Sequence, residues 1–440
     1  MRSSILLLSV VLLASCLRIG DTSQVCGEME VSMLEKRKAG GCAMDKLNVE
    51  LGEPVTVVQA PANIRAWGPY QFPGLERLAD GVIRVSFQVG ADSATAVGLP
   101  PMQAVSADEG KTWTVLPLPE TSTGAVSCTQ PPLRLPNGER IQIRMLRPLK
   151  VDTLQLPAEP VGKFVCYGGT FTYYSPEDLP AAARDGWRLY RFAKDGAAPV
   201  EEQATMRIPG ELRVVTEGVL PPPWYTGHRL LRAPDGAVWA IGEDCRIVDG
   251  RFRDTWAAII LRSTDHGHSF DLWGEIPYQP DPTADRQAAV RAGFTEPCVH
   301  FLPDGSVICF LRTTDGNGVG PMYWARSTDN GRTWSKPAVF DDLGVWPQAL
   351  TLGNGVTLVA YGRPGLFVRV TREPGGKQWG PRVEVVKPSQ VGTDTCSYCS
   401  LLPLSDDTAL IAYSEFNIPG PDGTPRKSIR VRRIAVERER

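Results

Sequence analysis

Histidine is scarce in this sequence, which contains only four among its 440 residues. A structural zinc site normally combines two pairs of cysteine or histidine ligands at comparable spacing. Cys396 and Cys399 form a C-x-x-C pair, but Cys298 and Cys309 flank a predicted hairpin and do not supply a second one. The histidines lie in a turn or in strand-like runs, where exposure or packing is the ordinary outcome. We therefore expect neither a metal site nor a cofactor.

The sequence also lacks a large excess of one sign of charge and a helical periodicity. The formal net charge is -2 and no long basic run occurs, which argues against nucleic acid as a partner. No apolar period of 3.6 residues persists in the body of the chain, so a helical architecture is not expected. Glycine (43) and proline (38) are abundant instead, as in chains with many short strands and turns. The composition favours an all-β fold.

The apolar run at the N-terminus is short, extending from Ile5 to Leu13 after Arg2. Such a run is too short for a stable membrane span but is typical of a secretory signal. The following Leu-Ala-Ser-Cys16 resembles the bacterial lipoprotein box, in which Cys16 becomes the lipidated first residue of the mature protein; ordinary cleavage nearby is the alternative. Residues 1–16 are thus predicted to be a signal peptide for export across the bacterial inner membrane.

Residues 17–44 are predicted to form a tether between this lipid anchor and the folded domain. The anchor would hold the protein in the periplasm or at the cell surface and would be its sole membrane contact. Cys26 and Cys42 lie in the tether and are possible disulfide partners in an oxidising compartment.

One eight-residue pattern, S-x-D-x-G-x-[ST]-[WF], occurs three times, at 106–113, 263–270 and 327–334. Its serine and aspartate side chains can bond nearby backbone amides, and its glycine can take the positive φ that a tight turn needs. A degenerate copy with one extra residue extends from Thr371 to Trp379. Repetition of one local structure indicates a repeat architecture. The pattern resembles the Asp-box, or BNR repeat, of the sialidase-like β-propeller family.

A second repeat predicts the number of structural units. Six turn signals, each flanked by apolar β-like runs, occur at Ala79-Asp80-Gly81, Pro136-Asn137-Gly138, Pro234-Asp235-Gly236, Pro303-Asp304-Gly305, Gly353-Asn354-Gly355 and Ser405-Asp406-Asp407. Blades of four-stranded propellers recur at roughly 40–50 residues, and longer intervals leave room for insertions. We expect residues 45–440 to form one six-bladed β-propeller with four-stranded antiparallel blades.

The hairpins also predict where side chains converge. If each turn lies at one face of the propeller, residues about eight positions before and after it return to the opposite face. This rule selects a polar set: Phe72 (next to Gln71), Thr129, Gly227, Glu296, Trp346 and Tyr398 before the turns, and Gln88, Met145, Glu243, Arg312, Arg363 and Glu415 after them. Charged residues that interrupt apolar strands need partners or water. They form either a salt-bridge network or a binding site.

The resemblance to sialidases extends to particular residues over roughly 50–435. The Glu296-Pro297 and Leu311-Arg312 segments resemble the family's glutamate and arginine on either side of a hairpin, and Gly362-Arg363-Pro364 resembles its next carboxylate-binding arginine. The resemblance implies the following roles: Tyr398 as nucleophile, Glu296 as its base, Asp92 as acid/base, Arg312 and Arg363 as ligands of a substrate carboxylate, and Glu415 as a supporting carboxylate in substrate binding.

One position departs from the family. Sialidases begin with an Arg-Ile-Pro motif that supplies the first arginine of a triad, whereas this chain has Gln71-Phe72-Pro73. Gln71 is the counterpart in substrate binding, but it can donate hydrogen bonds without contributing charge. A lost charge-assisted bond is worth roughly 1.5–3 kcal/mol. Glu415, which would pair with that arginine, then needs another partner, and Arg65 or Arg77 is a candidate.

Three functions are compatible with these features. The first is a retaining exo-glycosidase of sialidase type, which releases terminal sialic acid or a related acidic sugar from a glycan. The second is a catalytically weak or inactive carbohydrate-binding propeller, which Gln71 favours. The third is a non-carbohydrate scaffold that keeps only the fold, although the retention of Glu296, Arg312, Arg363 and Tyr398 argues against it.

Overall fold

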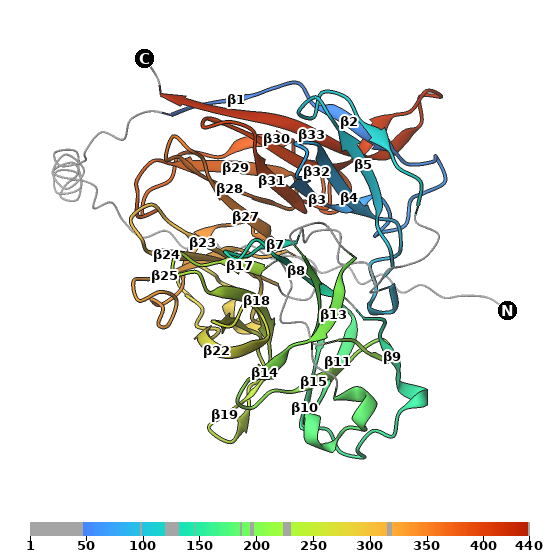
Figure 1. Cartoon of the computed structure of the whole chain (residues 1–440), viewed down its shortest axis with the longest axis vertical. Helices are drawn as coiled ribbons and strands as arrows, with labels where there is room; N and C mark the ends of the chain where they lie inside the picture. The colour runs from blue at the N-terminus through green and yellow to red at the C-terminus, as the bar shows by residue number, and fades with distance from the viewer. Residues whose placement is uncertain are drawn as a thin grey trace, which may run out of the picture. The chain divides into compact units, whose positions relative to one another are not determined.

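The computed structural model describes residues 47–438 except 97–98, 119–131, 145, 185–186, 194–197, 223–229 and 315–318. The predicted signal peptide, Cys16 and the tether lie outside the described residues, as do Thr129, Met145 and Gly227, so these predictions stay untested. Within the described part the chain is all-β: it contains strands and five short 3-10 turns, and no α-helix (Figure 1). None of the described helical segments is long and apolar enough to cross a membrane.

Most of the described strands belong to six sheets of four or five strands each. We number these sheets in the order of their first hairpins. Sheet 1 contains β3 (Gln71–Arg77), β4 (Ile83–Gln88), β5 (Met102–Ser106) and β6 (Thr114–Val115); sheet 2 contains β7 (Leu133–Arg134), β8 (Arg140–Arg144), β12 (Arg188–Phe192) and β13 (Val200–Gln203); sheet 3 contains β17 (Leu230–Arg232), β18 (Val238–Asp244), β21 (Ala257–Ser263), β22 (Ser269–Ile276) and β14 (Thr205–Arg207).

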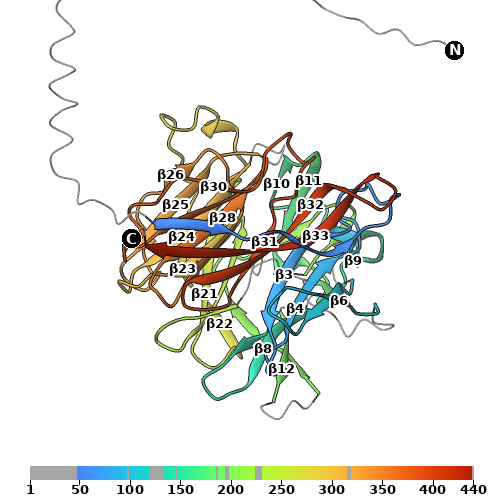
Figure 2. The same cartoon turned by 90° about the horizontal axis from the view of Figure 1, so that it is seen from above.

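The other three large sheets follow the same plan. Sheet 4 contains β23 (Phe294–Phe301), β24 (Val307–Thr313), β25 (Met322–Ser327) and β26 (Ala338–Asp341); sheet 5 contains β27 (Val345–Thr351), β28 (Thr357–Gly362), β29 (Leu366–Thr371) and β30 (Val383–Val386); sheet 6 contains β31 (Cys399–Pro403), β32 (Thr408–Pro419), β33 (Pro425–Arg438), β1 (Leu47–Leu51) and β2 (Val55–Gln59). In sheet 6 the N-terminal strands β1 and β2 both pair antiparallel with the C-terminal β33, so opposite ends of the described chain share one sheet (Figure 2).

Two smaller sheets occupy the long interval between the second and third predicted turns. They contain β10 (Gly162–Cys166), β11 (Gly169–Tyr174) and β15 (Arg213–Val215); and β9 (Leu149–Lys150) and β16 (Val219–Leu220). A third, of β19 (Ile247–Val248) and β20 (Arg251–Phe252), follows the third turn. The 3-10 turns are η1 (Ala94–Ala96), η2 (Val151–Thr153), η3 (Pro176–Asp178), η4 (Ala181–Ala183) and η5 (Ala288–Val290).

Each of the six predicted turns joins two consecutive strands of one large sheet, and all six of these pairs are antiparallel. Five of the turns carry a glycine with φ between 81° and 88°. The strand that follows such a turn is buried throughout in sheets 4 and 5, because β24 (VICFLRT) and β28 (TLVAYG) are packed on both faces. The hairpin prediction is therefore confirmed.

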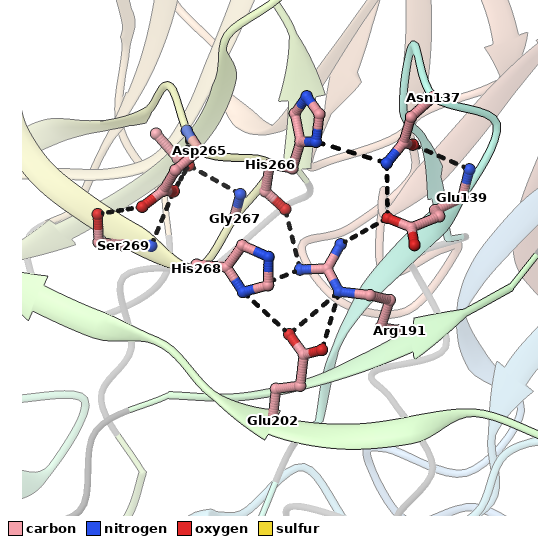
Figure 3. Close-up of polar contacts among 10 residues, drawn as sticks. Asn137, Glu139, Arg191, Glu202, Asp265, His266, Gly267, His268 and Ser269 are labelled. Carbon is pink, nitrogen blue, oxygen red and sulfur yellow. Dashed lines mark hydrogen bonds and ion pairs between the residues drawn. The ribbon is translucent and has the colours of Figure 1, made fainter.

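The three repeated S-x-D-x-G turns have the same hydrogen bonds. In the copy of sheet 3, Ser263 Oγ accepts from the Gly267 N–H at 2.8 Å, and Asp265 accepts from the backbone N–H of Ser269 at 2.9 Å (Figure 3). The copies that begin at Ser106 and Ser327 repeat both bonds. Local bonds within eight residues thus explain why the pattern recurs in the sequence.

The glycine of each repeated turn packs against the preceding sheet. Gly331 of sheet 4 lies against the buried Trp239 of sheet 3, and Gly267 of sheet 3 lies against Ile141 of sheet 2. Gly110 of sheet 1 lies against Leu410 of sheet 6. The degenerate copy follows the same rule, because its Gly376 lies against Leu302 of sheet 4. The repeated turns therefore contribute to the packing between sheets as well as to the hydrogen bonds within each sheet.

A polar cluster reinforces the junction of sheets 2 and 3 beside the turn at Asp265 (Figure 3). The buried guanidinium of Arg191 donates to Glu202 at 2.9 Å, to Glu139 at 3.2 Å and to the His266 carbonyl at 3.1 Å. His268 Nδ1 lies 3.3 Å from Glu202. One arginine thus connects two strands of its own sheet to the neighbouring turn.

Replacing glycine in these turns should separate backbone strain from crowding. Gly305→Ala and Gly331→Ala both place a side chain at positive φ, 83° and 79°. Open space surrounds a Cβ at Gly305, whereas a Cβ at Gly331 would overlap the Trp239 ring. We expect Gly305→Ala to lower the free energy of unfolding by about 1 kcal/mol and Gly331→Ala by roughly 1–3 kcal/mol more. Urea unfolding measures both; equal losses would contradict the packing role of the turn.

Candidate functional site

The carboxylate of Glu296 joins three sheets at one point. Its Oε1 accepts hydrogen bonds from the Tyr398 hydroxyl and from Arg312 Nη1. Its Oε2 accepts from the backbone N–H of Trp346 at 3.0 Å. Arg312 Nη1 also lies 3.5 Å from the Tyr398 oxygen. Three of the residues selected from the sequence, Glu296, Arg312 and Tyr398, are therefore in direct contact.

The ionisation states in this cluster follow from burial and charge. Burial raises the pKa of Tyr398 well above its usual value, and the neighbouring Glu296 carboxylate raises it further. Arg312 and Arg363 act in the opposite direction. The hydroxyl therefore keeps its proton at neutral pH and directs it at Glu296. Loss of this proton would require a neighbouring base, and Glu296 is the carboxylate in contact with it.

Aromatic rings fix the orientation of Tyr398. Its ring stacks on Trp346 with centroids 4.3 Å apart and meets the edge of Phe72 at 4.6 Å. The indole N–H of Trp346 donates to the Cys399 carbonyl at 3.2 Å, so the stacking partner is itself held. The phenol can move little without breaking these contacts.

The backbone is strained where the first strands of several sheets begin. Phe72, Glu296 and Trp346 have φ of 55°, 46° and 51°, and each precedes a proline. The strand register shifts at all three positions, so each is a β-bulge that turns a side chain away from the regular alternation. Ser397, next to Tyr398, has φ 64°. Such conformations cost about 1–3 kcal/mol each and gather at functional sites.

Arg363 is the second buried cation of the site. Its Nη2 donates to the Cys396 carbonyl at 2.7 Å, and its guanidinium lies 5.0 Å from the Trp67 ring centroid and 5.8 Å from that of Tyr398. Within the described ranges it has no ion pair, whereas Arg312 is paired with Glu296. Its Nε is buried and has no hydrogen-bond partner there. Arg363 is therefore the cation available to a bound anion.

Asp92 lies at the edge of this cluster and is held by Trp67, whose indole N–H donates to Asp92 Oδ2 at 2.8 Å. The residue keeps an exposed face, but burial of its carboxyl among the neighbouring residues raises its pKa. The negative charge of Glu296 also raises this pKa, whereas the Trp67 hydrogen bond and the two arginines lower it. Gly68 allows the approach, because a Cβ there would overlap the Asp92 backbone. The structure thus brings Asp92 within electrostatic reach of Glu296, Arg312 and Arg363.

A buried lysine supports the Trp67 segment. Lys427 donates to the carbonyls of Ala66 and Pro69, the second at 3.3 Å, and its amine lies 4.9 Å from the Phe416 ring centroid. Burial lowers the pKa of this amine. The lysine therefore connects β33 to the segment that contains Trp67, the hydrogen-bond donor to Asp92.

Gln71 is fully buried at the start of β3, where its Oε1 accepts from the Gly68 N–H at 2.9 Å. Its Nε2 is buried and has no hydrogen-bond partner among the described residues. The side chain therefore supports the Gly68 turn with one end and keeps an unused donor at the other.

The structure does not bring Glu415 into the cluster, which corrects the expectation from the sequence. Glu415 pairs with Arg430 on β33 at 2.6 Å, and neither Arg65 nor Arg77 is its partner. The reason is the two-residue period of a strand. Ser414 bonds the Cys396 N–H, and Phe416 packs with Phe72 and Cys396, so the residue between them points to the other face of β32.

Two residues that received no role from the sequence also belong to the site. Glu243 of β18 is half-buried and accepts a hydrogen bond from the Glu296 backbone N–H; the hairpin rule selected it without indicating its function. Tyr167 is 45% exposed at the tip of the β10–β11 hairpin, with its ring centroid 5.9 Å from the guanidinium carbon of Arg312. Tyr167 lies in the long insertion, outside both repeats, so no sequence signal pointed to it.

The cysteines of the C-x-x-C pair are buried free thiols. Cys396 Sγ lies 2.9 Å from Ser414 Oγ. Nowhere in the described ranges do three or more histidine, cysteine, aspartate or glutamate side chains gather in a way that would hold a metal ion.

Comparison with solved structures shows that the fold is shared with other proteins, one of them an α-L-arabinanase. A protein of unknown function from Dyadobacter fermentans matches at 19% identity and a TM-score of 0.59, over 88% of this chain and 99% of that chain. An α-L-arabinanase of Penicillium chrysogenum, complexed with arabinobiose, matches at 14% identity and 0.50, over 86% and 98%. Trypanosoma rangeli sialidase matches at 13% and 0.44, over 87% and 59%. No family model and no curated protein matches the chain.

The two glutamate–arginine pairs should differ in their effect on stability. Glu296→Gln leaves the buried Arg312 without a counter-charge, and we expect a loss of about 2–3 kcal/mol in the free energy of unfolding. Glu415→Gln removes the partly exposed pair with Arg430 and should cost less than about 1 kcal/mol. Urea unfolding of both variants at neutral pH tests this; a larger loss for Glu415→Gln would contradict the assignment of the central pair.

Proposed function

We propose that this protein is a retaining exo-glycoside hydrolase of the sialidase type, which acts on a terminal sialic acid or a related acidic sugar of a glycan. We propose further that the six large sheets are the blades of a six-bladed Asp-box propeller. Contacts between sheets 6 and 1, 2 and 3, 3 and 4, and 4 and 5 support this order. Sheets 5 and 6 share one apolar core that includes Leu358 and Ile411.

The observation that carries the proposal is the hydrogen bond from the Tyr398 hydroxyl to Glu296. A tyrosine is a poor nucleophile while protonated, and an adjacent base removes this obstacle. In the first step the Tyr398 oxygen bonds to the anomeric carbon, its proton passes to Glu296, and the bond to the leaving oxygen breaks. Arg312, which contacts both groups, stabilises the negative charge that moves between them.

The charge of the site favours an acidic sugar. A carboxylate beside the anomeric carbon would repel a carboxylate nucleophile, and a neutral tyrosine avoids this repulsion, as in sialidases. Arg363 has no counter-ion among the described residues and offers a charge-assisted hydrogen bond to such a group. The unpartnered Gln71 Nε2 adds a neutral donor.

Asp92 is the proposed acid/base. Its raised pKa favours a protonated carboxyl that can protonate the leaving oxygen, and its exposed face is accessible to the water that completes the reaction. The same residue would accept a proton from that water in the second step, which releases the sugar from Tyr398 with overall retention.

A non-catalytic carbohydrate-binding propeller is the alternative, and the neutral Gln71 in place of an arginine favours it. Arginine, glutamate and aromatic side chains around Tyr398 would then bind a sugar without turning it over. The two functions differ in whether the Tyr398 oxygen is needed for anything beyond binding.

Tyr398→Phe separates these functions. The variant removes the nucleophilic oxygen and keeps the ring that stacks on Trp346, so we expect hydrolysis of a fluorogenic α-sialoside to fall at least a thousandfold, with binding of free sialic acid changed by less than about tenfold. The chain from about residue 45 onward is the protein to assay. Tyr413→Phe, in the buried core of β32, is the matched control and should retain turnover.

The outcomes are distinct. Unchanged turnover in Tyr398→Phe would overturn the nucleophile assignment. Sugar binding without turnover in the unmodified protein would favour the binding function, and absence of both would exclude sialic acid as the ligand.

A further inference from the structure

Glu243 occupies the position in sheet 3 that arginines occupy in sheets 4 and 5. Glu243 lies eight residues after Asp235 of its hairpin turn, and Arg312 lies eight residues after Asp304. Arg363 follows Asn354 by nine residues. Three neighbouring sheets thus direct two cations and one carboxyl group toward the cluster around Glu296.

The two oxygens of Glu243 have different environments. One accepts the backbone N–H of Glu296, the residue held at φ 46°. The other, Oε2, is buried and has no hydrogen-bond partner in the described part of the chain. A buried carboxylate oxygen without a partner is costly, whereas a protonated one can serve as a donor.

The charged groups that face Glu243 favour the neutral form. They are Glu296 on β23, Arg312 on β24 and Asp244 on β18 itself. Arg312 is the single cation among them, and it is already paired with Glu296. An ionised Glu243 would therefore add a carboxylate beside a pair that is already neutral overall.

We propose that Glu243 works as a neutral carboxylic acid, which fixes the strained Glu296 backbone through one oxygen and donates a hydrogen bond from Oε2 to an oxygen of the bound sugar. This proposal rests on the function proposed above, because it assumes a sugar beside Glu296. Glu243 is thus a positioning residue for the base and a specificity residue for the substrate. It complements the neutral donor of Gln71 in a site with two arginines.

The pH at which Glu243 loses this proton can be measured. Burial, and next the charge of Glu296, raise the pKa of Glu243 to about 8, while the Glu296 N–H and Arg312 act against this rise. Above that pH the donor is lost and two adjacent carboxylates repel each other. Activity that depends on the proton should then fall by about tenfold between pH 7 and pH 9.

The first experiment compares kcat/KM for a fluorogenic α-sialoside across this pH range in the unmodified protein and in Glu243→Gln. Glutamine keeps an acceptor for the Glu296 N–H and supplies an N–H donor that does not titrate. Whatever its activity at pH 7, this variant should lack the tenfold fall. Glu384→Gln, an exposed glutamate of β30, is the matched control and should keep the fall.

The second experiment needs no activity. An unfolded glutamate loses its proton near 4.5, whereas folded Glu243 holds it to about 8. Between these values the folded state binds more protons, so this group lowers stability as pH rises from 5 to 9. The urea midpoint of Glu243→Gln should therefore move upward relative to the unmodified protein over this range, and that of Glu384→Gln should not.

Each result has one meaning. A pH fall present in the unmodified protein and absent in Glu243→Gln, with the matching change in urea midpoints, supports the proposal. An equal fall in both proteins overturns the donor role. Absence of turnover in every protein would defeat only the proposed function, because the urea series still tests whether Glu243 carries the proton. If the urea midpoints of the unmodified protein and of Glu243→Gln change equally with pH, the inference is overturned.

Discussion

The carboxylate of Glu296 is the interaction on which the site depends. It accepts hydrogen bonds from a phenol, a guanidinium and a backbone amide that lie up to 102 residues from it along the chain. A buried carboxylate is tolerated only when it is paired and hydrogen-bonded. The requirement to satisfy this one group therefore fixes the relative positions of sheets 4 and 5 and of the Tyr398 segment.

The packing of the sheets offsets the backbone strain at the starts of the strands. Positive φ at Phe72, Glu296 and Trp346 re-aims side chains that would otherwise alternate along their strands. The opposing free energy comes from buried strands such as β24 and β28, and from repeated turns whose glycines pack against the preceding sheet. A rigid stack of sheets can hold several unfavourable backbone conformations at one point, because relaxing any of them would disturb its neighbours.

The charge balance distinguishes this site from a simple cationic clamp. One arginine is neutralised by Glu296, and one, Arg363, has no ion pair in the described ranges. Two further polar groups of the site, Gln71 Nε2 and Glu243 Oε2, are buried atoms without a hydrogen-bond partner among the described residues. This charge balance supports the proposed acidic sugar, which carries a single negative group and several neutral oxygens.

The sequence by itself determined the hairpins, the repeated turns and the identity of most residues around Tyr398. These features depend on glycine at positive φ, on side-chain bonds that span four residues, and on the fixed rise of a strand, all of which are local. Tertiary structure alone decided that Glu415 faces away, that Gln71 is held by Gly68, that Glu243 bonds the Glu296 backbone, and that an inserted hairpin places Tyr167 beside Arg312. Each of these outcomes depends on which sheet face or loop meets which neighbour, and contacts between distant segments carry no periodic signal along the chain.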